Sequence, residues 1–446
     1  MRNPPERYLQ TLHEHFAKIP ALLANNVSIQ SEYQQILQTA PLTTNQDGKG
    51  TAFQRWFQFK EAFSPTFVTT AIESLGYRPK HVIDPFGGSG TTAITTQLLG
   101  INATTIEVNP FLADVIKSKV SRLTAEKLRS HAVVFQAQLT RSRSNLSRLS
   151  HLPPSFVEAE DKARWIFPLD VAKRLSQYLQ CIDEIEDEDI SRFFKVVLGA
   201  ILVDCSNVYV NGKGRRYRGA WQNNQPTSEK LDEMFGMQFN SAFSDVLRFE
   251  ERPQSRTNVV HGDVRTSLGQ VNQPADLIIF SPPYPNSFDY TDIYNVELWV
   301  LGYLKSSQDN LLLRSDTLRS HVQIHQSHET PRHQSAQLDA TLEALQGQAN
   351  QLWNRNIPQM VGSYFRDLEV VLEQCQRLLT GRGKVMMVVG DSRYAGVRIE
   401  VASILAEIAH SMGFGTVVTR EVRQMRSSAQ QGGRLQLAES IVELGL

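Results

Sequence analysis

The sequence predicts an α/β protein whose core is one doubly wound, largely parallel sheet. Two observations support this fold class. Short apolar strands alternate with helices in residues 51–120, and the alternation returns in residues 257–446. Apolar residues make up 41% of the 446-residue chain, which is enough to bury a sizeable core. We expect seven strands interleaved with helices, the last two forming a C-terminal hairpin.

The first half of the core contains two strand–helix units. Ser64 and Pro65 are typical of the N-cap and first position of a preceding helix. "KHVIDPF" predicts a buried strand, and "TTAITTQLLG" predicts a helix that ends at Gly100. "ATTIEVNP" predicts a second strand ending at Glu107, and "PFLADVIKSKV" predicts a second helix.

The second half continues the pattern. "NVVHGD" and "ADLIIFSPPY" predict strands, and "DYTDIYNVELWVLGYL" predicts a helix. The helix "FRDLEVVLEQCQRLLT" is followed by a predicted turn at "GRG", the strand "KVMMVVGDS" and the helix "VASILAEIAHSMGF". "TVVTREV" and "ESIVELGL" are the strands of the expected hairpin.

Three segments lie outside this alternation. Residues 1–50 predict an N-terminal arm. Residues 121–256 have mostly helical periodicity and predict a helical insertion, in which "NGKGRRYRGAWQNN" forms a loop. Residues 305–357 are polar and rich in His and Gln, and predict a second insertion. The core then comprises residues 51–120 and 257–446.

Composition restricts the classes of function. Lys and Arg number 46, as do Asp and Glu, so nucleic-acid affinity would need local basic patches. Three cysteines without a CxxC pair predict neither a disulfide framework nor a zinc site, which fits a reducing cytoplasm. No segment approaches about 18 consecutive apolar residues, so we expect no association with a membrane.

The stretch "DPFGGSGTT" follows the first strand and opens the next helix. Glycines there let a ligand approach the backbone closely. The stretch is not a Walker A loop, because no Gly-Lys-Ser/Thr follows, and it does not read G-x-G-x-x-G. A tight turn without a ligand is the simpler alternative.

Acidic residues near three strand ends suggest the ligand. Asp84 would repel phosphate but can pair with an ammonium group. Glu107 is placed for ribose hydroxyls, as in other nucleotide-binding folds. Asp263, in "HGD", is placed to accept from an adenine amino group. Ammonium, ribose and adenine together describe S-adenosylmethionine.

The stretch "SPPY", Ser281 to Tyr284, stands at the end of the fourth strand. Pro282 and Pro283 stiffen the backbone and remove two amide donors, which leaves a corner rich in acceptors. Such a corner suits a substrate that presents an NH₂ group, and Tyr284 adds a flat face for stacking a base. A strand exit stiffened by proline is the structural alternative.

These motifs resemble those of the S-adenosylmethionine-dependent DNA amino-methyltransferases. "DPFGGSGTT" resembles their motif I, "SPPY" their motif IV and "FKEAFSP" their motif X, over residues 51–120 and 257–446. The resemblance implies a Rossmann-like class I methyltransferase fold and S-adenosylmethionine as cofactor. It implies cofactor contacts from Phe63, Ser64, Asp84, Pro85, Phe86, Gly87, Gly88, Gly90, Thr91, Thr92, Glu107, Asn109 and Asp263.

The resemblance also implies a mechanism. The exocyclic amine of cytosine is a poor nucleophile because its lone pair is delocalised into the ring. Ser281 and the Pro282 carbonyl would accept the amine hydrogens and help to localise that lone pair. No Pro-Cys pair occurs, so a cysteine nucleophile is not expected. A base in a duplex must be flipped out, unless the DNA is already single-stranded.

Ser281 as the first residue of motif IV favours N4 of cytosine over N6 of adenine. Alternatives are an N6-adenine DNA methyltransferase, an RNA amine methyltransferase and a non-catalytic nucleic-acid-binding subunit on the same scaffold. We expect a sequence-specific modification or phage-defence role, in which a restriction or defence partner protein is possible. The sequence does not indicate the oligomeric state.

Basic and aromatic residues alternate in "YVNGKGRRYRGAWQ", which predicts contact with DNA. A solvated surface loop is the alternative, as it is for a second basic group flanking the last hairpin. The histidines at 321, 325, 328 and 333 lack a carboxylate-rich partner pattern, so we expect no metal site. The expected nucleic-acid contacts are Lys213, Arg215, Arg216, Tyr217, Arg218 and Trp221.

Overall fold

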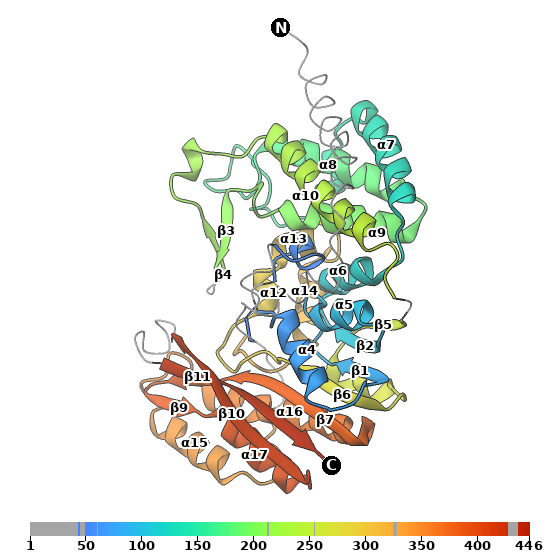
Figure 1. The fold of residues 1–446 in the computed structure, drawn as a ribbon. Helices are drawn as coiled ribbons and strands as arrows, with labels where there is room; N and C mark the ends of the chain where they lie inside the picture. The colour runs from blue at the N-terminus through green and yellow to red at the C-terminus, as the bar shows by residue number, and fades with distance from the viewer. Residues whose placement is uncertain are drawn as a thin grey trace.

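The computed structural model describes residues 43–44, 50–59, 61–211, 214–253, 255–323, 328–426 and 436–446. Most of the expected N-terminal arm, residues 1–50, lies outside these ranges. The described chain forms a twisted sheet with helices on both faces and a helical layer at one edge (Figure 1). Among the described residues, no helix is both long and apolar enough to cross a membrane.

Within the described chain, the main sheet has seven strands in the order β10-β11-β7-β6-β1-β2-β5. β11 runs antiparallel to both of its neighbours, whereas the other pairings are parallel. The predicted C-terminal hairpin is therefore confirmed, and its second strand lies between β10 and β7. The strands are β1 (His81–Asp84), β2 (Asn102–Glu107), β5 (Thr257–His261), β6 (Ala275–Phe280), β7 (Leu379–Gly390), β10 (Thr416–Arg426) and β11 (Gln436–Gly445).

Strand side chains alternate between the two faces, so each face has its own apolar cluster. Val82 of β1 packs in the cluster that contains α4, whereas Ile83 packs in the cluster that contains α16 and α17. The helices of the sheet layers are α4 (Pro65–Glu73), α5 (Thr91–Leu98), α6 (Pro110–Val120), α11 (Val264–Ser267), α16 (Ile357–Leu378) and α17 (Val401–Ser411).

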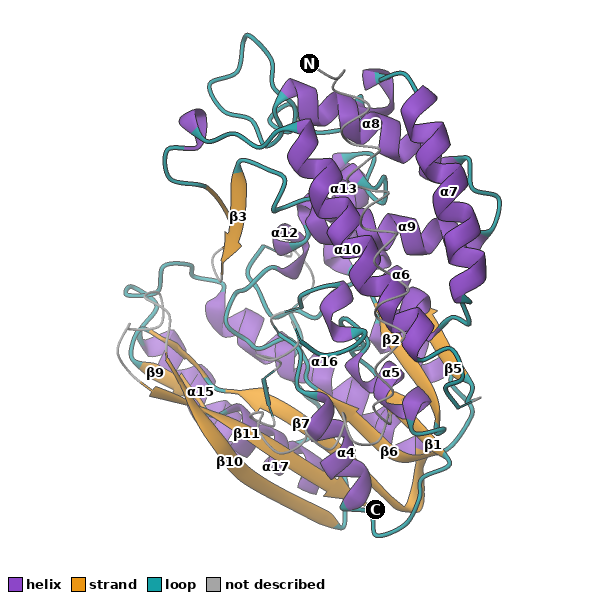
Figure 2. Ribbon diagram, turned by 45° about the horizontal axis from the view of Figure 1, so that its top comes forward, coloured by secondary structure: helices purple, strands orange, loops and turns teal. Residues whose placement is uncertain are grey.

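Residues 121–256 are mostly helical, as expected (Figure 2). These helices share one hydrophobic cluster with α5, α6 and α13, so they extend the core of the sheet domain. They are α7 (Ala125–Arg141), α8 (Leu169–Asp183), α9 (Glu188–Ile201) and α10 (Ser228–Arg248), and the segments after β6 are α12 (Tyr290–Ile293) and α13 (Asn295–Val300).

Two local predictions are wrong. The expected Gly/Arg loop contains a hairpin of β3 (Val208–Asn211) and β4 (Gly214–Tyr217), which reaches towards α12 (Figure 1). The predicted turn at residues 381–383 belongs to β7, where the register against β6 shifts. Both errors have one cause: Gly is disfavoured in strands by local propensity, but the available partner strand decides the conformation at both places.

The second insertion, residues 305–357, contributes two helices and several buried side chains to the core. It contains α14 (Ser307–Ser315) and α15 (Ala336–Gly347), and α15 packs against α16 and α17. Leu318, Leu338 and Leu345 are buried in the cluster beneath the sheet. Between the two helices, the described chain contacts the segment that follows β6, where the Ser287 amide donates to the Ser320 carbonyl.

Candidate active site

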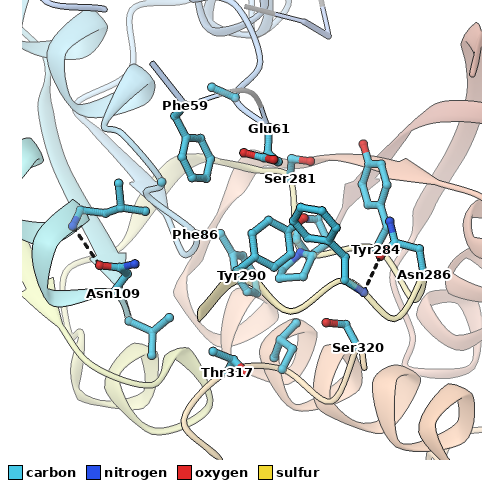
Figure 3. A pocket seen from close by; sticks show the side chains of 18 of the residues that line it. Phe59, Glu61, Phe86, Asn109, Ser281, Tyr284, Asn286, Tyr290, Thr317 and Ser320 are labelled. Carbon is cyan, nitrogen blue, oxygen red and sulfur yellow. Dashed lines mark hydrogen bonds between the residues drawn. The ribbon is translucent and has the colours of Figure 1, made fainter. Parts of the chain in front are cut away.

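A cavity of about 460 Å³ lies at the carboxyl ends of the parallel strands. This volume is within the range of roughly 300–1,000 Å³ that holds a cofactor-sized ligand. In open α/β sheets, ligands bind at this edge. The loops after β1, β2, β5, β6 and β7 all contribute to its lining. Figure 3 shows Phe86, Asn109 and Ser281, which follow β1, β2 and β6.

The glycine loop forms one end of the cavity. Pro85, Phe86 and Gly88 line it. Gly88 has φ +52°, and a Cβ there would lie 2.9 Å from the Phe59 ring, so glycine is required for this close approach. Lys119 is fully buried beneath the loop and its Nζ donates to the Ser89 carbonyl (2.6 Å), which fixes the loop from behind.

Glu107 and Asn109 line the same end. The Glu107 carboxylate accepts from the Gly88 amide (2.7 Å) and from the Asn109 amide (2.8 Å), and so joins the glycine loop to the loop after β2. Burial raises the pKa of Glu107 to about 8. Burial likewise raises the pKa of Asp84 to about 7, and Asp84 accepts from the Phe86 amide (3.0 Å) behind the cavity wall.

Several predicted cofactor residues support the cavity from outside it. Ser64 caps α4 and Phe63 packs on Phe67, while Asp263 caps α11 and pairs with Arg265. These residues do not line the cavity in the described chain, and the same holds for Asp84, Gly87, Gly90, Thr91 and Thr92. Gly90 instead adopts φ +86° at the start of α5 and packs on Ile116.

The "FKEAFSP" stretch does reach the cavity, but through earlier residues than expected. Phe59, Glu61 and Ala62 line it. Glu61 accepts from the Tyr294 hydroxyl (2.8 Å), and the Tyr294 ring stacks on Phe59 with centroids 5.5 Å apart. An acid beside aromatic rings is suited to a cation. No sequence pattern distinguished Glu61, because Tyr294 lies more than 230 residues away.

Ser281, Pro282, Pro283 and Tyr284 form the opposite end of the cavity. Tyr394 of the short strand β8 (Ser392–Tyr394) donates to the Pro285 carbonyl (3.1 Å) and holds this corner to the sheet. The Tyr284 ring lies directly against the backbone of Gly390, at the end of β7. Figure 3 shows Tyr284 upright beside the corner, with Phe86 and Tyr290 across from it.

The second insertion supplies a wall that sequence reasoning did not assign. Thr317, Ser320 and His321 line the cavity, and the Ser320 carbonyl accepts from the Ser287 amide (3.0 Å). His321 is buried and hydrogen-bonds to Gln323, and burial lowers the pKa of its imidazole. This histidine of the polar second insertion therefore belongs to the cavity wall, which its sequence context did not indicate.

The other histidines of that group have different surroundings. His325 lies outside the described residues, and His328 is exposed. His333 Nδ1 lies 2.7 Å from Glu369 Oε1, and the ligand atoms of His333, Glu369 and Glu373 lie within 4.8 Å of one another. Arg366 pairs with both carboxylates, so a guanidinium already balances their charge.

The predicted DNA-contacting residues divide into two groups. Arg218 donates to the carbonyls of Val203 and Ser206, and Trp221 packs edge-on against Trp165, so both stabilise the hairpin's base. Arg216 is exposed, and its guanidinium donates to the Arg215 carbonyl.

Arg215 links the hairpin to α13. Its guanidinium donates to Asn295 Oδ1 (2.9 Å) in α13 and lies over the Phe156 ring. Tyr217 is half-buried beside Trp221, with ring centroids 5.4 Å apart. Lys213 lies outside the described residues.

Comparison with known proteins identifies relatives over most of the chain. Type II methyltransferase M.AvaI of Nostoc sp. is 27% identical over 415 residues, covering 85% of this chain and 83% of the relative. M.BsoBI of Geobacillus stearothermophilus is 25% identical, and the match covers 90% of this chain and 87% of the length of M.BsoBI. M.MvaI of Kocuria varians is 24% identical over 47% of each.

No protein-family model matches the chain. A solved rRNA methyltransferase, AviRa of Streptomyces viridochromogenes, aligns over 94% of this chain and 93% of its own, with a TM-score of 0.28 and 8% identity. That score is too low to support an inference. The glycine loop, the SPPY corner and the relatives agree: the chain is a relative of the Type II methyltransferases, which confirms the DNA methyltransferase family named from its motifs.

Proposed function

We propose that this protein is an S-adenosylmethionine-dependent DNA methyltransferase of a restriction–modification system that methylates N4 of cytosine. The observation that carries the proposal is one continuous cavity, which the glycine loop lines at one end and the SPPY corner at the other. Methyl transfer needs a donor and an amine held together in one site, and much of its rate enhancement comes from this positioning.

The glycine-loop end fits the cofactor. The Glu107 carboxylate accepts hydrogen bonds from two backbone amides. Its remaining lone pairs can accept from ribose hydroxyls. Glu61 lines the cavity and Asp84 does not, so Glu61 is the better partner for the cofactor's ammonium group. The bound cofactor supplies an electrophilic methyl group on a sulfonium.

The SPPY end fits the target amine. Ser281 Oγ and the Pro282 carbonyl accept the two amine hydrogens, which localises the lone pair that attacks the methyl carbon. The exposed face of Tyr284 stacks on the flipped base. Ser281 itself favours cytosine, because a hydroxyl group here replaces the amide or carboxylate typical of the adenine enzymes.

The β3–β4 hairpin is the proposed contact with the DNA backbone near the target. It packs on the helices that follow the SPPY corner, because β4 contacts α12 and Arg215 bonds to α13. Arg216 is the exposed cation in the described part of this hairpin. Residues 121–256 would then carry target recognition as well as structural support.

The test is a methyl-transfer assay. The protein is incubated with S-[methyl-³H]adenosylmethionine and unmodified bacterial DNA, and the labelled nucleoside is identified by mass spectrometry. We expect N4-methylcytosine, and none with Ser281→Ala at unchanged cofactor affinity. N6-methyladenine would refute the choice of base. A parallel reaction contains bacterial RNA in place of DNA, and label in RNA alone, or in neither nucleic acid, would refute the proposed DNA methyltransferase.

A further inference from the structure

Glu439 of β11 lies at the SPPY end of the cavity, yet the motifs do not include it. Its side chain is 3% exposed. Its carboxylate forms an ion pair with Arg423 of β10, and Oε1 accepts from the Tyr284 hydroxyl (2.9 Å). An acid from the last strand is thereby joined to the tyrosine of motif IV.

A β-bulge produces this arrangement. β10 and β11 pair regularly up to Glu421 and Ser440, and then the register shifts so that Arg423 stands opposite Glu439. Bulges re-aim side chains near active sites, and directly opposed residues of opposite charge stabilise each other. Without the extra residue, Arg423 would not face Glu439.

We propose that Glu439 is a positioning residue that sets the direction of the hydrogen bonds leading to Ser281. This inference rests on the proposed function of Ser281 as the acceptor for the target amine. A carboxylate paired with arginine is an acceptor only, so the single hydrogen of Tyr284 must point to Glu439. The Tyr284 oxygen can then only accept from its other partner.

Ser281 lies beside Tyr284 at the same end of the cavity, and we take its side chain as that partner. Burial raises the pKa of Tyr284, and the smaller effect of the interaction with Ser281 lowers this pKa, as a donor to the Tyr284 oxygen does. Ser281 also has one hydroxyl hydrogen, which must point to Tyr284. The lone pairs of Ser281 Oγ are therefore left for the hydrogens of the target amine. If the direction were reversed, the Ser281 hydrogen could point to the amine nitrogen and compete for the lone pair that attacks the methyl group.

The test uses Glu439→Gln, whose amide can donate as well as accept and so permits both directions. Glu443→Gln is the matched control, because Glu443 lies on the same strand and pairs with Lys384 outside the cavity. Tyr284→Phe removes the connecting hydroxyl. Single-turnover methyl transfer is measured at saturating cofactor and DNA, and calorimetry gives the cofactor affinity.

We expect Glu439→Gln and Tyr284→Phe each to lower the single-turnover rate about tenfold, which is the loss expected when the transition state loses the contribution of one hydrogen bond. The cofactor affinity and the KM for DNA should stay unchanged, and the double variant should lose no more than either single one. Glu443→Gln should match the wild type.

Two results would overturn the role of Glu439: a normal rate in Glu439→Gln, or losses that multiply in the double variant. If Glu439→Gln does not fold, Tyr284→Phe decides, because a normal rate there refutes the connection through its hydroxyl. A wild-type protein that methylates no DNA refutes the proposed function itself. The two failures are therefore distinguishable.

Discussion

A single methyl group at Gly390 should displace Tyr284 and slow methyl transfer. An ideal Cβ at this position would lie 2.4 Å and 2.6 Å from two ring carbons of Tyr284, and 2.6 Å from the Met425 methyl group. Carbon atoms in contact are normally about 3.5–4.0 Å apart. The Met425 side chain is flexible and can move away. The Tyr284 ring must retreat by about 1 Å, which strains its 2.9 Å hydrogen bond to Glu439.

The expected cost follows from this displacement. A shift of about 1 Å in an active site can lower a rate about 100-fold, equivalent to about 2.7 kcal/mol of transition-state stabilisation. Overpacking should also lower the free energy of unfolding by about 1–3 kcal/mol. The cofactor end of the cavity is not touched, so cofactor affinity should be unchanged.

The assay compares Gly390→Ala with Gly381→Ala, which lies on the same strand and whose added Cβ would meet no atom within 4 Å. Methyl transfer to DNA is measured at saturating cofactor, cofactor affinity by calorimetry and stability by urea unfolding. Gly381→Ala should retain the wild-type rate. A wild-type rate in Gly390→Ala would show that the position of Tyr284 does not limit the reaction, and a parallel loss of cofactor binding would show that the damage is not local.

Three further outcomes are expected. Glu61→Gln should weaken cofactor binding about tenfold in calorimetry, whereas the exposed Glu73→Gln should not, and equal affinities would contradict the role of Glu61. Burial raises the pKa of Glu107 to about 8, so its carboxyl group is mostly protonated at pH 7. Hydrogen bonds from ribose hydroxyls favour the ionised form. Cofactor binding should therefore release a proton at pH 7, and the affinity should increase as the pH rises to about 8. Calorimetry in two buffers of different ionisation enthalpy measures that proton, and Glu107→Gln should abolish it. Arg216→Ala should raise the KM for DNA and reduce the slope of log affinity against log salt concentration by about 0.9. Arg218→Ala should instead chiefly lower the melting temperature. An unchanged salt slope in Arg216→Ala would exclude a phosphate contact.

The fold was predictable because its signals are local. A strand, a glycine loop and a helix follow one another within residues 81–98, and the helix caps at Ser64 and Asn109 are single-residue signals. Parallel strands place the loops at their carboxyl ends on one edge of the sheet. That rule alone brings "DPFGGSG", Glu107 and "SPPY" together, and the cavity lies there.

The shape of the site was not predictable in the same way. Glu61 accepts a hydrogen bond from Tyr294, and Glu439 accepts one from Tyr284. Gly390 leaves space for the Tyr284 ring. The two residues of each of these pairs are more than 100 residues apart in the sequence. The second insertion had no strand pattern, yet Ser320 and neighbouring residues line the cavity. Such contacts depend on strand register and on one bulge in β10, which no short stretch encodes.

The sequence by itself therefore determined the α/β class, the two motifs and the edge of the sheet at which they meet, because local hydrogen-bonding and burial preferences specify them. Only the tertiary structure decided which residues face the ligand. In the folded chain, Asp84, Ser64 and Asp263 support the cavity from outside, whereas Glu61 and Glu439 line it. The physical reason is that a side chain's direction is set by the packing of strands and helices that are far apart in the chain.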